Sequence, residues 1–142
     1  CDLRICAEHA KMGQPEINLG IIPGFGGTQR LPRIIGSARA LEMLLSGDPI
    51  DAQTAFAWGL VNHVTSAADL LPKALGLAQN VATKAPVASR LIHESVAEGL
   101  TKTINQGLRL EIQTFHKVFA TEDKTEGISA FIEKRAAQWK GQ

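Results

Sequence analysis

The sequence predicts a mixed α/β fold for residues 1–65, followed by an all-helical lobe over residues 66–142, with helix predominating overall. Short stretches with strand character occur in the first part, whereas apolar residues recur at helical spacing from Ser66 onward. The 142 residues are 44% hydrophobic and 20% charged, a composition typical of a globular protein with a packed core. We therefore expect two domains, divided near residue 65.

The first part is expected to contain short strands and short helices separated by glycines. Residues 2–12 predict one or two strands, and residues 60–64 predict another, because both stretches are rich in apolar and β-branched residues. Ser37 and Asp51 are expected N-caps. Helices are expected to end at three glycines, because glycine readily adopts the left-handed conformation of a C-cap: Gly36, Gly47 and Gly59.

The second part is expected to consist of helices alone. Ser66 followed by Asp69 forms a capping-box pattern, which predicts a long amphipathic helix. Pro86 predicts the start of the next helix and Gly99 its end, and Thr101 is expected to cap a third helix. The third helix carries a continuous apolar stripe: Ile104, Leu108, Ile112, Phe115 and Phe119. Such a stripe is either a core face or a surface that subunits bury together.

Charge and hydropathy exclude several classes of function. The formal net charge is +1 and the basic residues are scattered, so neither nucleic acid nor an anionic membrane is an expected partner. No apolar run approaches the roughly 18 residues that span a bilayer. Cys1 and Cys6 are the only cysteines, which fits a reducing compartment. No metal site is expected, because no two histidines have metal-ligand spacing: His9, His63, His93 and His116.

Residues 13–31 are the most informative segment for function, because they place one carboxylate beside a glycine-rich turn. Pro15 fixes its own φ and restricts the residue before it, so Glu16 is expected on a stiff part of the chain. The next residues are expected to form an apolar wall that raises the pKa of the carboxyl group and suits a proton donor: Ile17, Leu19, Ile21 and Ile22. The spacing is equally compatible with a Pro-Glu pair that simply opens a helix.

The turn at residues 23–27 contains three glycines, whose backbone N–H groups can approach a small ligand closely. A helix is expected to begin after it, at Thr28. No Lys-Ser or Lys-Thr follows the turn, and Gln29 stands where a dinucleotide fingerprint requires Gly or Ala. The turn is therefore expected to bind water or an oxyanion, and neither ATP nor NAD.

Residues 13–31 resemble the signature of the crotonase superfamily, which comprises enoyl-CoA hydratases and isomerases. The resemblance covers essentially all 142 residues and continues through five further stretches: residues 45–48, 59–61, 84–86, 119–123 and 126–135. It implies the C-terminal half of an enoyl-CoA hydratase. Residues 1–65 are then the last part of a crotonase-like ββα spiral, and residues 66–142 are a helical lobe that packs a trimer and covers bound CoA.

The resemblance also implies roles for individual residues. Glu16 corresponds to the second of two glutamates that hold one water molecule, and by position it is the proton donor. Gly24 corresponds to the glycine whose backbone N–H faces that water. Phe115 and Lys134 correspond to residues that contact the adenine and phosphates of CoA, which suits a flat ring and a flexible cation. The first glutamate and both oxyanion N–H groups fall before Cys1, so the isolated chain is expected to be inactive.

The function that the resemblance implies is addition of water to a trans-2-enoyl-CoA in fatty-acid or acyl-CoA degradation. No cofactor is expected, because CoA is part of the acyl-CoA thioester substrate. The full-length protein is expected to be a homotrimer or a dimer of trimers, with the apolar stripe at a shared interface, in the bacterial cytoplasm or the mitochondrial matrix. Two alternatives stay open: an enoyl-CoA isomerase or another acyl-CoA lyase or hydrolase of this family, and a non-catalytic oligomerisation module.

Overall fold

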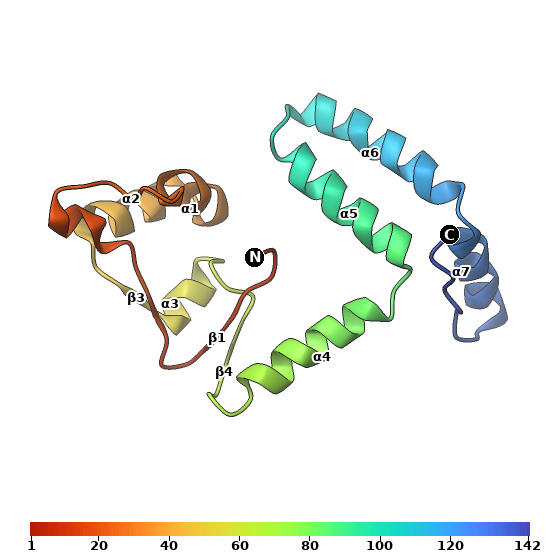
Figure 1. Cartoon of the computed structure of the whole chain (residues 1–142), viewed down its shortest axis with the longest axis horizontal. Helices are drawn as coiled ribbons and strands as arrows, with labels where there is room; N and C mark the ends of the chain where they lie inside the picture. Colours follow the sequence, from red (N-terminus) through yellow and green to blue (C-terminus); the bar gives the residue numbers. More distant parts are fainter. The chain divides into compact units, whose positions relative to one another are not determined.

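The computed structural model describes residues 1–142 as helices joined by short loops, with four very short strands (Figure 1). The strands are β1 (Ile5–Ala7), β2 (Lys11–Met12), β3 (Ile50–Asp51) and β4 (His63–Thr65). The helices are the 3-10 helix η1 (Pro15–Leu19) and α1 (Gly27–Ile35), α2 (Ser37–Ser46), α3 (Ala52–Ala57), α4 (Leu70–Ala82), α5 (Pro86–Gly99), α6 (Ile104–Phe119) and α7 (Glu122–Glu133). The predicted class, helix-rich α/β, is confirmed.

The chain divides into two compact units, Cys1–Gly76 and Leu77–Gln142. The first unit contains all four strands, which form two small sheets. β1 pairs with β4 in parallel, and β2 pairs with β3 in the antiparallel direction. Both strand predictions are confirmed in position, although the second strand begins at His63 rather than at residue 60. Gly59, with a φ of 78°, lies in the turn between α3 and this strand.

Two clusters of buried side chains form the core of the first unit. The first cluster consists of Cys6, Ala52, Ala55 and Val61. The second cluster consists of Leu31, Ile35, Ala40 and Met43. Met12, Ile50 and Leu60 pack against both clusters and join them. The core therefore holds the two sheets against α1, α2 and α3, which places the segment between β2 and α1 at a defined position.

Helix ends in the first unit follow the expected glycine and aspartate signals with one exception. Gly36 and Gly47 end α1 and α2 with φ values of 85° and 70°. Asp51 caps α3, because its Oδ1 accepts a hydrogen bond from the Thr54 N–H at 2.7 Å. The expectation that Ser37 is an N-cap is wrong. The N-cap of α2 is Gly36, because one residue both ends α1 and begins α2 with a φ that favours glycine.

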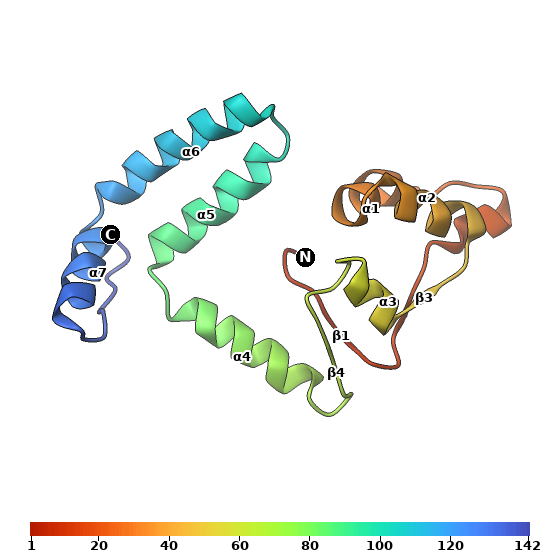
Figure 2. The same ribbon diagram turned by 180° about the vertical axis from the view of Figure 1, so that it is seen from behind.

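The second unit contains the helical hairpin of α5 and α6, which lie side by side in both views (Figures 1 and 2). Pro86 opens α5 and Gly99 is its last residue, as predicted. The expectation that Thr101 caps α6 is wrong. Thr103 is the N-cap, in a capping box with Gln106. Thr101 instead donates its hydroxyl to the Glu98 carbonyl at 2.7 Å, which satisfies the end of α5.

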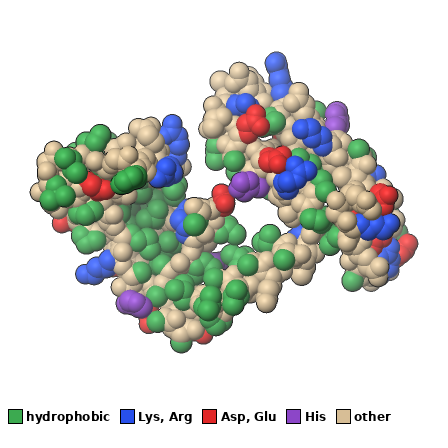
Figure 3. Space-filling model, viewed as in Figure 1, with side chains coloured by type: hydrophobic (Ala, Val, Ile, Leu, Met, Phe, Trp, Pro, Cys, Tyr) green, Lys and Arg blue, Asp and Glu red, His purple; other side chains and the backbone are tan.

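The apolar stripe on α6 is not part of a core within this chain. Its five side chains are between 48% and 76% exposed. Hydrophobic side chains reach the surface in both units (Figure 3). None of the helices has the length and hydrophobicity needed to cross a membrane. Of the two expected uses of the stripe, the core face is therefore wrong, and a surface buried by other polypeptide stays a prediction.

Candidate active site

Glu16 lies in the first turn of η1, the short 3-10 helix that begins at Pro15. The Pro-Glu pair therefore does open a helix, and the proton-donor role of Glu16 stays a prediction. The helix ends at Gly20, which has a φ of 72°. η1 packs against α2 at Gly47, where an added Cβ would lie 2.8 Å from both Asn18 Nδ2 and Ile17 Cγ2. This close approach fixes η1, and with it the partly buried Glu16, to the core.

The expected apolar wall around Glu16 is wrong for this chain. Leu19, Ile21 and Ile22 are 77%, 55% and 73% exposed, so they do not enclose the carboxylate. Their exposure follows from the short length of η1, because the chain turns at Gly20 and runs on without a helix until α1. These side chains form an exposed apolar surface beside the carboxylate instead.

The glycine turn packs directly on the segment that carries Glu16. An added Cβ at Gly27 would lie 2.8 Å from the side-chain amide of Gln14 and 2.8 Å from Pro23 Cβ, so only glycine fits there without a shift. Gly26 is the N-cap of α1 with a φ of 82°, and α1 begins at Gly27, one residue before the expected start at Thr28. The absence of a side chain at Gly27 therefore lets the turn pack against Gln14, two residues before Glu16.

A hollow of about 300 Å³ lies between these two segments. Its lining combines one carboxylate, one amide, one guanidinium and apolar surface: Gln14, Glu16, Phe25, Gly27, Arg30, Leu31 and Ile34. With its amide nitrogen toward the carboxylate, Gln14 donates to Glu16 Oε1 and Oε2 at 3.1 and 3.3 Å. The Arg30 guanidinium donates to the carbonyl of Phe25, which ties the turn to α1. The carboxylate is thus oriented, and its side of the hollow is polar.

Gly24 lies in the same turn but does not line this hollow. It is exposed, and an added Cβ would meet nothing within 4 Å. Its backbone N–H has no acceptor within the chain, so it is available to a water molecule or ligand. Gly24 therefore belongs to the turn whose residues Phe25 and Gly27 line the hollow with Glu16, and its role toward the reacting water stays a prediction.

Phe115 and Lys134 both lie in the second unit, at separate places. Phe115 is 58% exposed on α6 and stacks against Phe119, with ring centroids 5.2 Å apart. It lines an apolar groove of about 340 Å³ between α5 and α6, and Lys134 does not line that groove. Lys134 is exposed at the end of α7 with a φ of 54°, and it is the only residue other than glycine with a positive φ.

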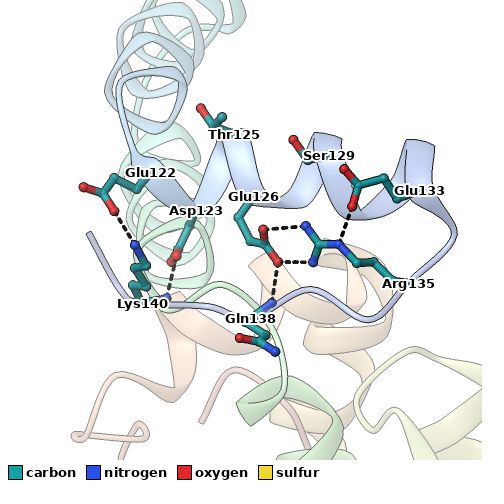
Figure 4. Close-up of a pocket in the computed structure, with 9 residues that line it drawn as sticks. All are labelled: Glu122, Asp123, Thr125, Glu126, Ser129, Glu133, Arg135, Gln138 and Lys140. Atoms are coloured by element: carbon teal, nitrogen blue, oxygen red, sulfur yellow. Dashed lines mark hydrogen bonds and ion pairs between the residues drawn. The ribbon is translucent and has the colours of Figure 1, made fainter.

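The sequence does not predict the contacts within one group of polar residues in the second unit. Arg135 forms a two-point ion pair with Glu126, with N–O distances of 2.6 and 2.9 Å, and its Nε donates to Glu133 at 2.6 Å (Figure 4). The hydrogen bonds from Arg135 hold the pKa of Glu126 well below its usual range, at about 2, and the Gln138 N–H adds to this effect. Glu126 and Arg135 are nine residues apart, a spacing that no helical pattern predicts.

A second carboxylate fastens the end of the chain to α7. Asp123 is only 3% exposed, and it accepts a hydrogen bond from the backbone N–H of Lys140 at 2.7 Å (Figure 4). It accepts another from the backbone N–H of Gly141 at 3.0 Å. Trp139 donates its indole N–H to the Thr83 carbonyl at 2.8 Å. Residues 136–142, which we call the tail, are thus anchored on both sides of Trp139. The polar groups beside α7 border a hollow of about 740 Å³.

The comparisons with known proteins identify the family of this chain. Residues 1–142 match the profile described as Enoyl-CoA hydratase/isomerase along their whole length. The chain belongs to the enoyl-CoA hydratase/isomerase family. The predicted resemblance is therefore confirmed.

Individual relatives agree with this family. The chain is 48% identical over 139 residues to a probable enoyl-CoA hydratase, echA8, of Mycobacterium leprae (strain TN), which covers 98% of the chain and 54% of the relative. It is 45% identical over 139 residues to a crotonyl-CoA hydratase of Syntrophomonas wolfei, again covering 98% of the chain and 54% of the relative. The chain thus spans about half the length of these hydratases.

Solved structures of the family share the fold. A crystal structure of an enoyl-CoA hydratase from Bacillus anthracis is 44% identical and has a TM-score of 0.97, over 100% of this chain and 55% of that chain. An enoyl-CoA hydratase from Mycobacterium tuberculosis is 31% identical with a TM-score of 0.94, over 100% of this chain and 56% of that chain. The crotonase-like fold predicted for this part of an enoyl-CoA hydratase/isomerase is confirmed.

Proposed function

We propose that residues 1–142 form part of an enoyl-CoA hydratase, in which Glu16 donates a proton and the Gly24 N–H holds the reacting water. The observation that carries the proposal is the hollow that Glu16 shares with Phe25 and Gly27 of the glycine turn, with Gln14 donating to the Glu16 carboxylate oxygens at 3.1 and 3.3 Å. The names of the relatives from Mycobacterium leprae and Syntrophomonas wolfei support hydration as the reaction.

In this reaction, the hydroxyl of a water molecule adds to the β-carbon of a trans-2-enoyl-CoA, and a proton adds to the α-carbon. Negative charge builds on the thioester oxygen during the addition, so backbone N–H groups that bind this oxygen lower the barrier. The first glutamate removes the proton from the water, while Glu16 supplies the proton to carbon. A proton must then pass back to Glu16 before the next turnover.

Residues 1–142 provide only some of these groups. The first glutamate and both thioester-binding N–H groups belong to residues outside 1–142, which is compatible with relatives about twice as long. The isolated chain is then inactive. The complete protein is a homotrimer or a dimer of trimers, in the cytoplasm or the mitochondrial matrix, and takes part in acyl-CoA degradation. The exposed stripe on α6 supports an assembly in which other polypeptide covers it.

Phe115 and Lys134 bind the CoA moiety of the substrate in this proposal. Phe115 offers an exposed aromatic face beside an apolar groove, which suits stacking of an adenine ring. Lys134 offers an exposed ammonium, which suits a phosphate group. No separate cofactor is required, because the CoA is part of the substrate.

The test is loss of the enoyl-thioester absorbance of crotonyl-CoA, measured with the complete protein and with the 142-residue chain. We expect turnover by the complete protein only. Glu16→Gln in the complete protein is expected to reduce turnover by roughly two to four orders of magnitude, the usual contribution of a positioned general acid. Glu42→Gln, which changes an exposed carboxylate on α2, is the matched control and is expected to leave turnover unchanged.

Three results would contradict the proposal. Near-normal hydration by Glu16→Gln would remove Glu16 from the reaction. A product with a shifted double bond and no added water would favour the isomerase alternative. A folded, oligomeric complete protein that neither binds nor converts crotonyl-CoA would favour the oligomerisation module.

A further inference from the structure

The backbone conformation of Lys134 is unusual for a residue with a side chain. Its φ of 54° and ψ of 40° place it in the left-handed region at the end of α7. Glycine is the common residue at such a helix end, because a Cβ is disfavoured there. A glycine would close the same turn without strain, so the turn itself does not require a lysine. Strained residues of this kind indicate a functional constraint.

The turn around Lys134 is closed by backbone hydrogen bonds to the last turn of α7. The Lys134 N–H donates to the Phe131 carbonyl at 3.3 Å, and the Arg135 N–H donates to the Ala130 carbonyl at 3.0 Å. These two bonds form the pattern that normally accompanies a left-handed helix end. The position of the Lys134 Cα is thereby fixed relative to α7.

Side-chain contacts reinforce this turn from both sides of Lys134. Glu133 and Arg135, the residues before and after it, bond to each other at 2.6 Å. Arg135 also reaches back to both carboxylate oxygens of Glu126, and Glu126 accepts the Gln138 N–H at 2.8 Å (Figure 4). We call Glu126, Glu133 and Arg135 the clamp. The chain on either side of Lys134 is therefore bound to the same helix.

Within the clamp, the Arg135 guanidinium pairs with both carboxylates, and Lys134 takes part in neither ion pair. The Nε, Nη1 and Nη2 atoms of Arg135 all donate to clamp carboxylates. Lys134 has no carboxylate partner within the chain, and its side chain is exposed. An ammonium with three donors and no acceptor is suited to the oxygens of a phosphate group.

We propose that the clamp is a positioning device, in which Glu126 and Glu133 act through Arg135 to hold Lys134 with its ammonium set for a phosphate group of the acyl-CoA. The inference rests on the proposed function, because it takes acyl-CoA as the ligand. Arg135 and the two glutamates touch no ligand in this arrangement. They keep Lys134 in a conformation that it would otherwise leave, which raises the fraction of the protein that is ready to bind.

The test is titration calorimetry on the complete protein with two probes, acetoacetyl-CoA and acetoacetyl-pantetheine, which lacks the phosphates. Lys134→Ala is expected to lower the affinity for acetoacetyl-CoA about tenfold, the usual loss when a hydrogen bond to a charged group is removed. Glu126→Gln is expected to lower the same affinity about three- to tenfold, because the fraction of the protein with Lys134 in the binding conformation falls to roughly a third or a tenth. Neither change is expected to affect acetoacetyl-pantetheine.

The sign of the Glu126→Gln effect separates positioning from simple electrostatics. Removing a negative charge near the site would strengthen phosphate binding if charge alone mattered. Positioning predicts the opposite sign, and it predicts no further loss when Glu126→Gln is added to Lys134→Ala. Glu94→Gln is the matched control, because it removes the carboxylate of an exposed ion pair with Arg90, 2.8 Å long, on α5. The control is expected to bind both probes normally.

Further variants guard against misfolding as an explanation. Arg135→Lys keeps the charge but loses the two-point contact, and it is expected to behave like Glu126→Gln. Lys134→Gly relieves the strained backbone, so it is expected to unfold at the same or a higher temperature while losing affinity as Lys134→Ala does. If Lys134→Ala weakens the binding of acetoacetyl-CoA and Glu126→Gln does not, the positioning role of the clamp is overturned, while the phosphate contact of Lys134 stands. If Lys134→Ala has no effect, the phosphate contact proposed for Lys134 fails, and the clamp with it.

Discussion

Removal of the Asp123 carboxylate is expected to release the tail, residues 136–142, from α7. Asp123 is 3% exposed and accepts two backbone hydrogen bonds, from Lys140 at 2.7 Å and from Gly141 at 3.0 Å. A hydrogen bond to a charged group contributes about 1.5 to 3 kcal/mol net. We use the lower figure for both bonds, because the two N–H groups regain water when the tail is released. Asp123→Ala is then expected to cost about 3 kcal/mol, or roughly a hundredfold in the population of the released tail.

The assay is fluorescence and acrylamide quenching of Trp139, in a background where Trp58→Phe leaves one tryptophan. Trp139 is partly buried, its ring lies against Gly127, and its indole N–H donates to Thr83, so tail release exposes it to quencher. Asp123→Asn keeps one acceptor oxygen and is expected to give an intermediate effect.

Glu122→Gln is the matched control for the tail. Glu122 pairs with the Lys140 ammonium at 3.0 Å, but both side chains are more than 60% exposed, and exposed ion pairs contribute little. The control is expected to leave Trp139 protected. Equal quenching in Asp123→Ala and Glu122→Gln would refute the reasoning, because burial and backbone hydrogen bonding would then have no special weight.

Three further predictions concern pH, packing and capping. Arg135 lowers the pKa of Glu126 from 4.5 to about 2, so the stability from this ion pair is present above pH 4.5 and is lost as the pH falls through 2. Trp139 fluorescence should follow this loss in the native sequence, and Glu126→Gln should abolish that acid-dependent step. Gly27→Ala is expected to destabilise the protein by about 1 to 3 kcal/mol in thermal unfolding, because the added Cβ would overlap Gln14 and Pro23. Gly76→Ala on α4, where nothing lies within 4 Å, should instead be neutral or slightly stabilising. Thr103→Ala is expected to lose about 1 kcal/mol of stability, since it removes the N-cap of α6, and an equal loss in Thr101→Ala would contradict the observed capping.

Features that depend on neighbouring residues were predictable from the sequence. Pro86 and Gly99 bound α5, and Asp51 caps α3, because each signal acts within one turn of helix. The proximity of Glu16 to the glycine turn was also predictable, since only seven residues separate Glu16 from Gly24. Thr101 and Thr103 show the limit of such signals. Both are chemically able to cap a helix, and the loop geometry decides between them.

Features that depend on distant residues required the tertiary structure. The contact between Gly27 and Gln14 arises because the chain folds back on itself after η1. The pairs Glu126–Arg135 and Asp123–Lys140 form because the chain reverses at Lys134 and the tail returns along α7. Spacings of 9 and 17 residues carry no helical or strand period, so no pattern in the sequence marks them.

Local motifs and periodicity are sufficient to predict the family, the helix-rich α/β class and the segment that carries Glu16. The exposure of Leu19, Ile21 and Ile22, which were expected to form a wall around Glu16, could be seen only in the folded chain, because burial depends on which other segments reach a side chain. The folded chain also places Lys134, in a strained conformation, between the residues of an ion-pair clamp. The neighbours of Lys134 in the sequence do not fix its conformation. That conformation accompanies the chain reversal that brings Arg135 within reach of Glu126.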